Sequence, residues 1–415
     1  MSQNNALSSF NAHTAGRPNL YPRNSRLSQR LFMLLLLSGL AFAAFSLYQD
    51  VGAAGVSDLR FLPFLLLGLA LLTALAFEFV NGFHDTANAV ATVIYTHSLP
   101  PTVAVVWSGV FNFLGVMLSS GVVAWGIISL LPMELLAQAS SGHGFAMIYA
   151  LLFSAMIWNL GTWWLGLPSS SSHTLIGSII GVGIANALMH GGSGLEGVNW
   201  QQARSVGYAL LLSPLVGFTC AALLLLLMKL LVRNRQLYRA PQGNTPPPLW
   251  VRGMLILTCT GVSFAHGSND GQKGMGLIML ILVGCLPSVY TLYNDGQIIP
   301  LWVKVVVAIA LALGTMVGWR RIVLTVGEKI GKSHLSYAQG ASAELVAMGT
   351  IGAADAFGLP VSTTHVLSSG VAGTMAANGS GVQLATLRNL AIAWVLTLPA
   401  SILLSALLFW LFSQL

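Results

Sequence analysis

The stretch Asn81-Gly-Phe-His-Asp-Thr-Ala-Asn-Ala89 places one aspartate and two asparagines inside an otherwise apolar part of the chain. From Leu62 to Val80 the preceding residues are apolar except Thr73 and Glu78, and apolar residues resume after the stretch. An ionisable group within a membrane span is costly and by default indicates a functional site. Gly82 predicts a helix broken at membrane depth, which is tolerated where the backbone is buried in protein or lines a cavity. An ordinary helix end at the membrane interface is the alternative.

A second stretch, His266-Gly-Ser-Asn-Asp-Gly-Gln-Lys-Gly274, repeats this pattern, since Gly82 and Asp85 both recur 185 positions later. A second pair of motifs, Gly166-Leu-Pro-Ser-Ser-Ser-Ser-His-Thr174 and Gly358-Leu-Pro-Val-Ser-Thr-Thr-His-Val366, is separated by 192 positions. Two different motifs that recur in the same order predict an internal duplication.

The composition is that of a multi-pass membrane protein. Of 415 residues, 55% are hydrophobic and 7% are charged, whereas a soluble domain has about 25% charged residues. The net charge of +7 comes from Lys and Arg clusters between apolar segments, so it reports topology, and nucleic acid is not an expected partner. The three cysteines lie in apolar segments without metal-ligand spacing, which favours a packing role.

Apolar runs and positive charges together predict the topology in an inner (plasma) membrane. Residues 1–60 form a basic cytoplasmic tail and an extra first helix, residues 61–232 the first transmembrane repeat, residues 233–252 a basic cytoplasmic linker and residues 253–415 the second repeat. The second repeat then begins inside where the first began outside, and the C-terminus is external. We therefore expect an all-α polytopic membrane protein with two inverted-topology repeats, broken helices and re-entrant hairpins.

Each Asp-containing motif is expected within one broken span, at Leu62–Ile94 and Met254–Val289, because two separate spans in the second repeat would place the basic residues after Trp319 outside. Val103–Leu131 is expected to form a single span. The loop Pro132–His143 has no Lys or Arg and is expected outside.

Five acidic residues fall at membrane depth, with one basic residue beside a motif: Glu78, Asp85, Asp270, Glu344, Asp355 and Lys273. Glu78 lies seven residues before Asp85, about two helical turns away on the same face. A structural role for Glu78, bonding to the broken helix, is as consistent with this position as a transport role. The sequence offers no specific role for Asp355.

The hydroxyl clusters Ser169–Ser172 and Ser362–Thr364 each follow a proline that would begin a helix. Free backbone N–H groups and the positive end of the helix dipole make such a start an anion site. Two such starts that meet near the midplane of an inverted repeat describe a transporter binding site. Asp85 and Asp270 would repel an anion there by several kcal/mol at about 4 Å, so the anion is expected to enter together with cations.

These residues resemble the PiT family of inorganic phosphate transporters, whose duplicated Gly-Ala-Asn-Asp-Val-Ala-Asn-Ala signature corresponds to residues 82–89 and 267–274. The likeness extends from about residue 62 to the C-terminus and is greatest to the bacterial low-affinity, proton-coupled type. It implies alternating access, often a homodimer, and transport of phosphate as a neutral complex with a divalent metal such as magnesium, together with protons. No resident cofactor is expected.

The resemblance also implies the site residues. Phosphate is expected at Asp85, Asn88, Asn269, Asp270, Ser170, Ser171, Ser172, Ser362, Thr363 and Thr364. Coupling to cations or protons is expected at Glu78, Asn81, Asp85, Asp270, Lys273 and Glu344, with the metal at Asp85 and Asp270. The chain departs from the family signature at His84 and at Lys273, both in place of asparagine. We hypothesise that the Lys273 ammonium occupies the place that sodium fills in sodium-coupled relatives.

Three other readings are open. The first is a sodium-coupled phosphate symporter, which would belong to the same family and differ in the coupling ion. A membrane-embedded hydrolase could be built from His84, His173, His266 and His365 with nearby serines, but neither a Gly-x-Ser-x-Gly nor a His-Glu-x-x-His motif is present, and we expect no enzyme. A cation channel lined by the aspartates is less consistent with glycine-broken helices in an inverted repeat.

Overall fold

A computed structural model describes residues 18–21, 25–53, 61–85, 87–131, 142–241, 243, 245–287, 289–290 and 298–414. The expected external loop Pro132–His143 lies almost entirely outside these residues, as do Thr86 and most of the basic tail. The helices of the described residues are α2 (Arg26–Ala53), α3 (Phe61–Asp85), α4 (Ala87–Tyr95), α5 (Pro101–Leu118), α6 (Val122–Ile128), α8 (Gly142–Trp164), α9 (Ser171–Met189), α10 (Trp200–Leu231), η1 (Arg235–Tyr238), α11 (Leu249–Cys285), α13 (Leu301–Thr315), α14 (Arg320–Leu324), η2 (Thr325–Lys329), α15 (Tyr337–Ala356), α16 (Thr363–Asn378) and α17 (Leu384–Phe412).

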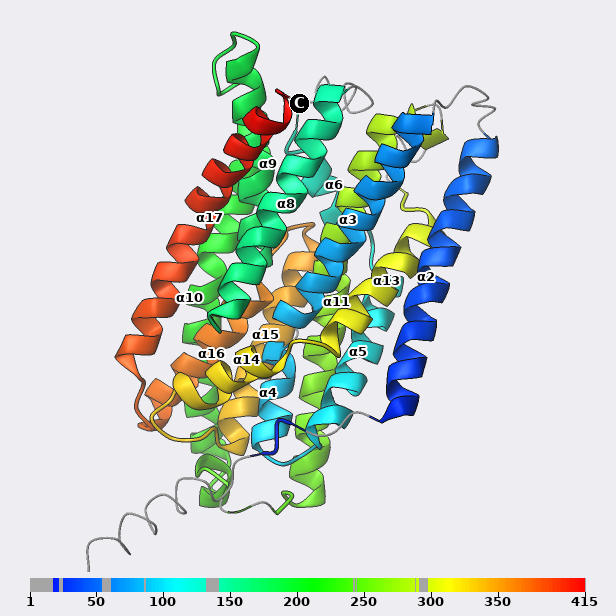
Figure 1. The fold of residues 1–415 in the computed structure, drawn as a ribbon. Helices are drawn as coiled ribbons and strands as arrows, with labels where there is room; N and C mark the ends of the chain where they lie inside the picture. Colours follow the sequence, from blue (N-terminus) through cyan, green and yellow to red (C-terminus); the bar gives the residue numbers. More distant parts are fainter. Residues whose placement is uncertain are drawn as a thin grey trace, which may run out of the picture.

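The described residues form an all-α membrane bundle (Figure 1). Eight helical segments are long and apolar enough to cross a membrane, and the bent pair of α13 with α14 and η2 could provide a ninth. No strand occurs among the described residues, which contain one isolated bridge between Gly331 and Val382. The predicted all-α polytopic class is confirmed.

The two Asp-containing motifs differ in backbone structure. In the first, α3 ends at Asp85 and α4 begins at Ala87, so the break follows the aspartate and not Gly82. The second motif lies within the continuous 37-residue helix α11, so the prediction of a broken helix there was wrong. The predicted span Val103–Leu131 is not one continuous helix, because Gly121, at φ +88°, separates α5 from α6.

Close helix crossings explain the glycines that suggested broken helices. A Cβ on Gly82 of α3 would lie 2.3 Å from a backbone oxygen of α13, and one on Gly314 of α13 would lie 2.1 Å from a backbone oxygen of α3. Gly267 of α11 and Gly115 of α5 form the same kind of crossing, at 2.2 Å in each direction. Each motif helix therefore packs tightly against a helix of the other half of the chain.

Two helical hairpins meet at their tips inside the bundle. Figure 1 shows α8 and α9 reaching inward from the upper side and α15 and α16 from the lower side. The Ser172 hydroxyl donates to the Val361 carbonyl oxygen at 2.7 Å, and the rings of His173 and His365 lie 4.7 Å apart. The hydroxyl-rich loops therefore lie against each other, next to the motif helices.

The start of α2 and the central segment around η1 lie on the lower side of the bundle in Figure 1, and the C-terminal end of α17 lies on the upper side. This relative placement is the one that charge counting predicts. Which side faces the cytoplasm stays a prediction.

Candidate functional site

Asp85, the last residue of α3, lies where α3, α9 and α16 meet and is 2% exposed. One carboxylate oxygen accepts a short hydrogen bond from the Ser171 hydroxyl of the first hairpin. The other accepts from the Thr364 hydroxyl of the second hairpin at 2.7 Å and lies 3.0 Å from Nδ1 of His84. Asp85 therefore bonds to both hairpins at once.

Asn88, near the start of α4, extends this contact to the second hairpin. Its amide nitrogen donates to the Thr364 hydroxyl at 3.0 Å and to the Asp85 carbonyl oxygen at 2.9 Å. Ser368 donates to the Asn88 side-chain oxygen at 3.4 Å.

Asp270 and Lys273 of α11 form a fully buried ion pair, with Nζ of Lys273 2.7 Å from Oδ2 of Asp270. Lys273 also donates to the Ser171 hydroxyl at 3.2 Å, and Thr363 donates to Oδ1 of Asp270 at 3.4 Å. The ammonium thus lies between the second motif and the first hairpin.

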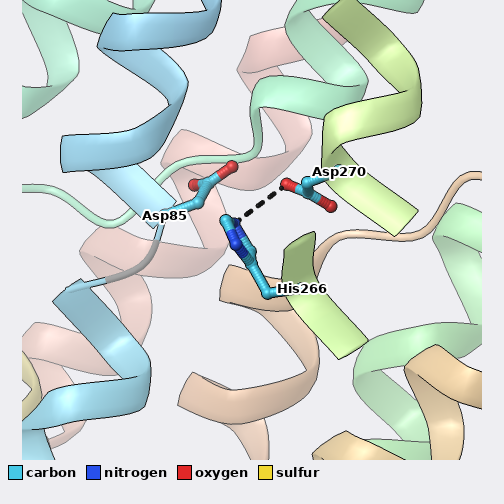
Figure 2. A group of neighbouring side chains, drawn as sticks. All are labelled: Asp85, His266 and Asp270. Atoms are coloured by element: carbon cyan, nitrogen blue, oxygen red, sulfur yellow. Dashed lines mark ion pairs between the residues drawn. The ribbon is translucent and has the colours of Figure 1, made fainter. Parts of the chain in front are cut away.

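His266 of α11 completes a group with the two aspartates. The imidazole and the carboxylates of Asp85 and Asp270 point toward one another (Figure 2), and one ligand atom from each lies within 4.8 Å of the others. Nδ1 of His266 is 3.1 Å from Oδ1 of Asn112, whose amide nitrogen donates to Thr315 at 2.9 Å. If the imidazole is neutral and donates from Nδ1 to Asn112, its Nε2 lone pair faces Oδ2 of Asp270 at 3.3 Å, and this contact is repulsive unless a cation lies between the two atoms. Two carboxylates and one imidazole suit a divalent cation.

The serines that precede the hairpin helices cap them. Ser170 accepts the His173 N–H at 3.2 Å at the start of α9, and Ser362 accepts the His365 N–H at 3.2 Å at the start of α16. The predicted helix starts are therefore confirmed at equivalent positions of both hairpins, and each cap takes one of the N–H groups that an anion would otherwise use.

Two other predicted phosphate ligands hold the backbone of the second hairpin. The Asn269 amide nitrogen donates to the Leu359 carbonyl oxygen at 3.1 Å, and its side-chain oxygen accepts the Val361 N–H at 3.3 Å. Ser172 bonds to the same segment through the Val361 carbonyl oxygen. In this conformation both side chains position the loop.

The predicted coupling residues outside the cluster are buried in separate pairs. Asn81 donates to Glu78 at 3.4 Å, and a Cβ on Gly274 would lie 2.6 Å from the other Glu78 oxygen, so α3 and α11 are in direct contact here. Glu344 of α15 accepts a short hydrogen bond from Thr258 of α11. None of the described hydrogen bonds joins either pair to the Asp85 and Asp270 cluster.

Comparisons with known proteins identify the family. Residues 81–405 match the model of the phosphate transporter family. The chain belongs to this family. A low-affinity inorganic phosphate transporter of Buchnera aphidicola subsp. Acyrthosiphon pisum is 37% identical, over 83% of this chain and 96% of the relative. PitA of Escherichia coli strain K12, also named a low-affinity inorganic phosphate transporter, is 37% identical over 84% and 97%.

A further bacterial relative supports this assignment, and a solved structure shares the fold. A probable low-affinity inorganic phosphate transporter of Bacillus subtilis strain 168 is 37% identical, over 83% of this chain and 97% of the relative. A structure titled as the sodium-dependent phosphate transporter superposes with a TM-score of 0.67 at 21% identity, covering 84% of this chain and 99% of that one, which shows a shared fold. Relatives named as transporters agree with the prediction that the chain is not an enzyme.

Within the family fold, both departures from the signature contact the cluster. His84 bonds to Asp85 through Nδ1, and its Nε2 lies 3.3 Å from the Ser169 hydroxyl. Lys273 pairs with Asp270.

Sequence reasoning missed four residues of the network: His266 as a partner of the aspartates, Asn112, Thr315 and Ser368. The 185-residue offset could have found His266, because it aligns His266 with Asn81, which was a candidate. Asn112 and Thr315 lie on α5 and α13, outside both motifs, and carry no sequence signal.

Proposed function

We propose that this chain imports inorganic phosphate across the inner (plasma) membrane, as a neutral complex with a divalent metal and together with protons, by alternating access. The observation that carries the proposal is that Asp85 and Asp270, which form a group with His266, both accept hydrogen bonds from hairpin hydroxyls. Metal ligands and anion-binding hydroxyls then lie side by side in one buried cluster, as a metal–phosphate complex requires.

Charge supports the metal. With both aspartates ionised, Lys273 protonated and the histidines neutral, the cluster carries one net negative charge. A phosphate dianion alone would raise this to three in a buried site, where like charges about 4 Å apart cost about 4 kcal/mol at an effective dielectric constant of 20. A metal–phosphate complex leaves the net charge unchanged, and one accompanying proton neutralises it.

Burial supports alternating access. Asp85, Asp270 and Lys273 are at most 2% exposed, and the Ser171 and Thr364 hydroxyls already donate to Asp85. Phosphate needs the same hydroxyl protons, so the substrate can bind only when the hairpins move apart and exchange these bonds. Hairpins that enter from opposite sides, as in Figure 1, fit two inverted repeats at residues 61–232 and 253–415, in which each hairpin gates one side.

Protons are proposed to use the carboxyl groups outside the ion pair. Glu78 is fully buried, and one of its oxygens has no hydrogen-bond partner among the described residues. A buried carboxyl in this condition is better accommodated in its neutral form than as a charge. Sodium is not proposed as the coupling ion, because Lys273 already supplies a cation next to Asp270.

Phosphate uptake into proteoliposomes tests the proposal. An inward proton gradient is imposed with magnesium present, with magnesium chelated, or with a sodium gradient in its place. We expect uptake that requires the proton gradient and falls when magnesium is chelated. Sodium-driven uptake without a proton requirement would reject proton coupling, and magnesium-independent uptake would reject the metal complex. We also propose that the chain forms a homodimer, which cross-linking in native membranes tests.

A further inference from the structure

A cavity of about 380 Å³ lies at the bend between α13 and α14. It is lined by Tyr21, Trp163, Met316, Val317, Gly318, Trp319, Arg320 and Arg321. α13 and α14 meet here at 53°, on the half of the bundle that also holds the start of α2 (Figure 1). Four of the eight lining residues are aromatic or glycine, two are arginines, and none is acidic.

The two arginines stack on aromatic rings. The Arg320 guanidinium carbon lies 5.2 Å from the centre of the Tyr21 ring and 5.6 Å from that of Trp319. Arg321 lies 5.0 Å and 4.4 Å from the rings of Trp163 and Trp164 and donates a short hydrogen bond to the Trp164 carbonyl oxygen. Stacking of this kind holds the planar groups in place and leaves their edges to bind a ligand.

The two arginines make few hydrogen bonds to the described part of the chain. Among the described residues, the buried Nε of Arg320 has no hydrogen-bond partner, and no carboxylate lies within ion-pair distance of either guanidinium. Two adjacent positive charges repel each other, so an anion between them would relieve the repulsion and complete their hydrogen bonds.

We propose that this cavity binds a phosphate-group anion, at Arg320 and Arg321, separately from the Asp85 and Asp270 cluster. Guanidinium groups match phosphate oxygens in a two-point geometry, and basic pockets between membrane helices bind lipid headgroups. The ligand is either the headgroup of an anionic phospholipid or free phosphate. The volume falls in the range of about 300–1,000 Å³ typical of organic ligands.

The position of the cavity connects it to the transport machinery. Trp163, the last but one residue of α8, donates from Nε1 to the Gly318 carbonyl oxygen at 2.7 Å, and its ring lies edge-on to Phe83 at 5.2 Å. Gly318, at φ +70°, packs on Phe83, where a Cβ would lie 2.9 Å from the ring. A bound anion would thus contact the bend, the first hairpin helix and, through Phe83, the segment that carries His84 and Asp85.

Thermal unfolding of the purified full-length chain in detergent tests the site. The protein is titrated separately with dihexanoyl phosphatidylglycerol, with the zwitterionic dihexanoyl phosphatidylcholine, and with potassium phosphate against potassium chloride. The double variant Arg320→Gln/Arg321→Gln is compared with wild type. The control is Arg388→Gln, an exposed arginine near the start of α17 that does not line the cavity.

We expect one of the two anions to stabilise the wild type, and its half-maximal concentration to rise about tenfold or more in the double variant but not in Arg388→Gln. If the half-maximal concentration of phosphatidylglycerol rises in the double variant, the ligand is a lipid headgroup. If that of phosphate rises, the ligand is the free ion. Midpoints that are equal in wild type and double variant for both anions would overturn the proposal, as would the absence of stabilisation by either. If the double variant does not fold, the single variant Arg321→Gln provides the same comparison, because Arg321 is exposed and its replacement disturbs packing least.

Discussion

At the scale of single residues, Lys273 contacts both Asp270 and Ser171. The asparagine that the family signature has at this position is too short to reach both residues at once. The Lys273 ammonium reaches Asp270 at 2.7 Å on its own helix and Ser171 at 3.2 Å on the first hairpin. A buried carboxylate without a cationic partner is strongly destabilising, so we expect this position to decide which cation Asp270 requires.

Lys273→Asn is expected to exchange the coupling ion. With the ammonium gone, Asp270 needs another cation, so uptake driven by protons alone should fall by about tenfold or more, and external sodium should restore part of it. Uptake into proteoliposomes with proton and sodium gradients measures this, with the exposed Lys332→Asn as the matched control. Unchanged proton dependence without a sodium effect would show that Lys273 does not fill a cation site.

His266→Ala is expected to weaken metal dependence specifically. Removing one of three converging ligand atoms should raise the magnesium concentration for half-maximal uptake by about tenfold or more, since even outer partners of metal ligands contribute 10- to 100-fold. Magnesium titration of phosphate uptake measures it. His334→Ala, which removes a histidine stacked on Tyr95 away from the group, is the control. A loss of maximal rate at an unchanged magnesium midpoint would indicate a structural role for His266.

At the scale of helices, glycine crossings bring the two halves of the chain together. Gly82 and Gly314 let α3 and α13 approach until side-chain atoms would overlap the opposite backbone. The sequence marked Gly82 and Gly267 as special because they recur in the motifs, but a glycine that breaks a helix and one that permits close contact look alike in a single sequence. The distinction depends on α13 and α5, which lie far away in the sequence. For that reason the hairpin starts and the acidic residues that meet in the candidate site could be found from the sequence. The continuous α11 and the contacts of Asn112 and Asn269 could not, because they depend on distant parts of the chain.

Gly314→Ala is expected to destabilise the bundle by about 1–3 kcal/mol through overpacking, because its Cβ would lie 2.1 Å from a backbone oxygen that cannot rotate away. Thermal unfolding in detergent measures the effect. Gly207→Ala in α10, where a Cβ meets nothing within 4 Å, should leave stability unchanged or raise it slightly. Equal melting temperatures for Gly314→Ala and wild type would mean that α3 and α13 are less closely packed than described.

At the scale of the whole molecule, the arrangement joins one buried polar cluster to two hairpins that enter from opposite sides. α2 lies outside the residues that match the family and packs at the edge of the bundle, where Asp50 accepts a hydrogen bond from the Trp302 indole at 2.9 Å. The basic linker and the start of α2 lie on the same side of the bundle, and the positive-inside rule predicts that this side faces the cytoplasm.

Labelling of single cysteines in intact cells tests that orientation. The three native cysteines, which are all free, are replaced by serine, and Gln236→Cys and Gln414→Cys are introduced separately at exposed positions on opposite sides of the bundle. A membrane-impermeant maleimide should label the residue-414 variant in intact cells and the residue-236 variant only after permeabilisation, because the arginines around η1 hold that face inside. Retained phosphate uptake by both variants is the control for folding. The opposite labelling pattern would invert the topology, and the hairpin of α8 and α9 would then gate the cytoplasmic side.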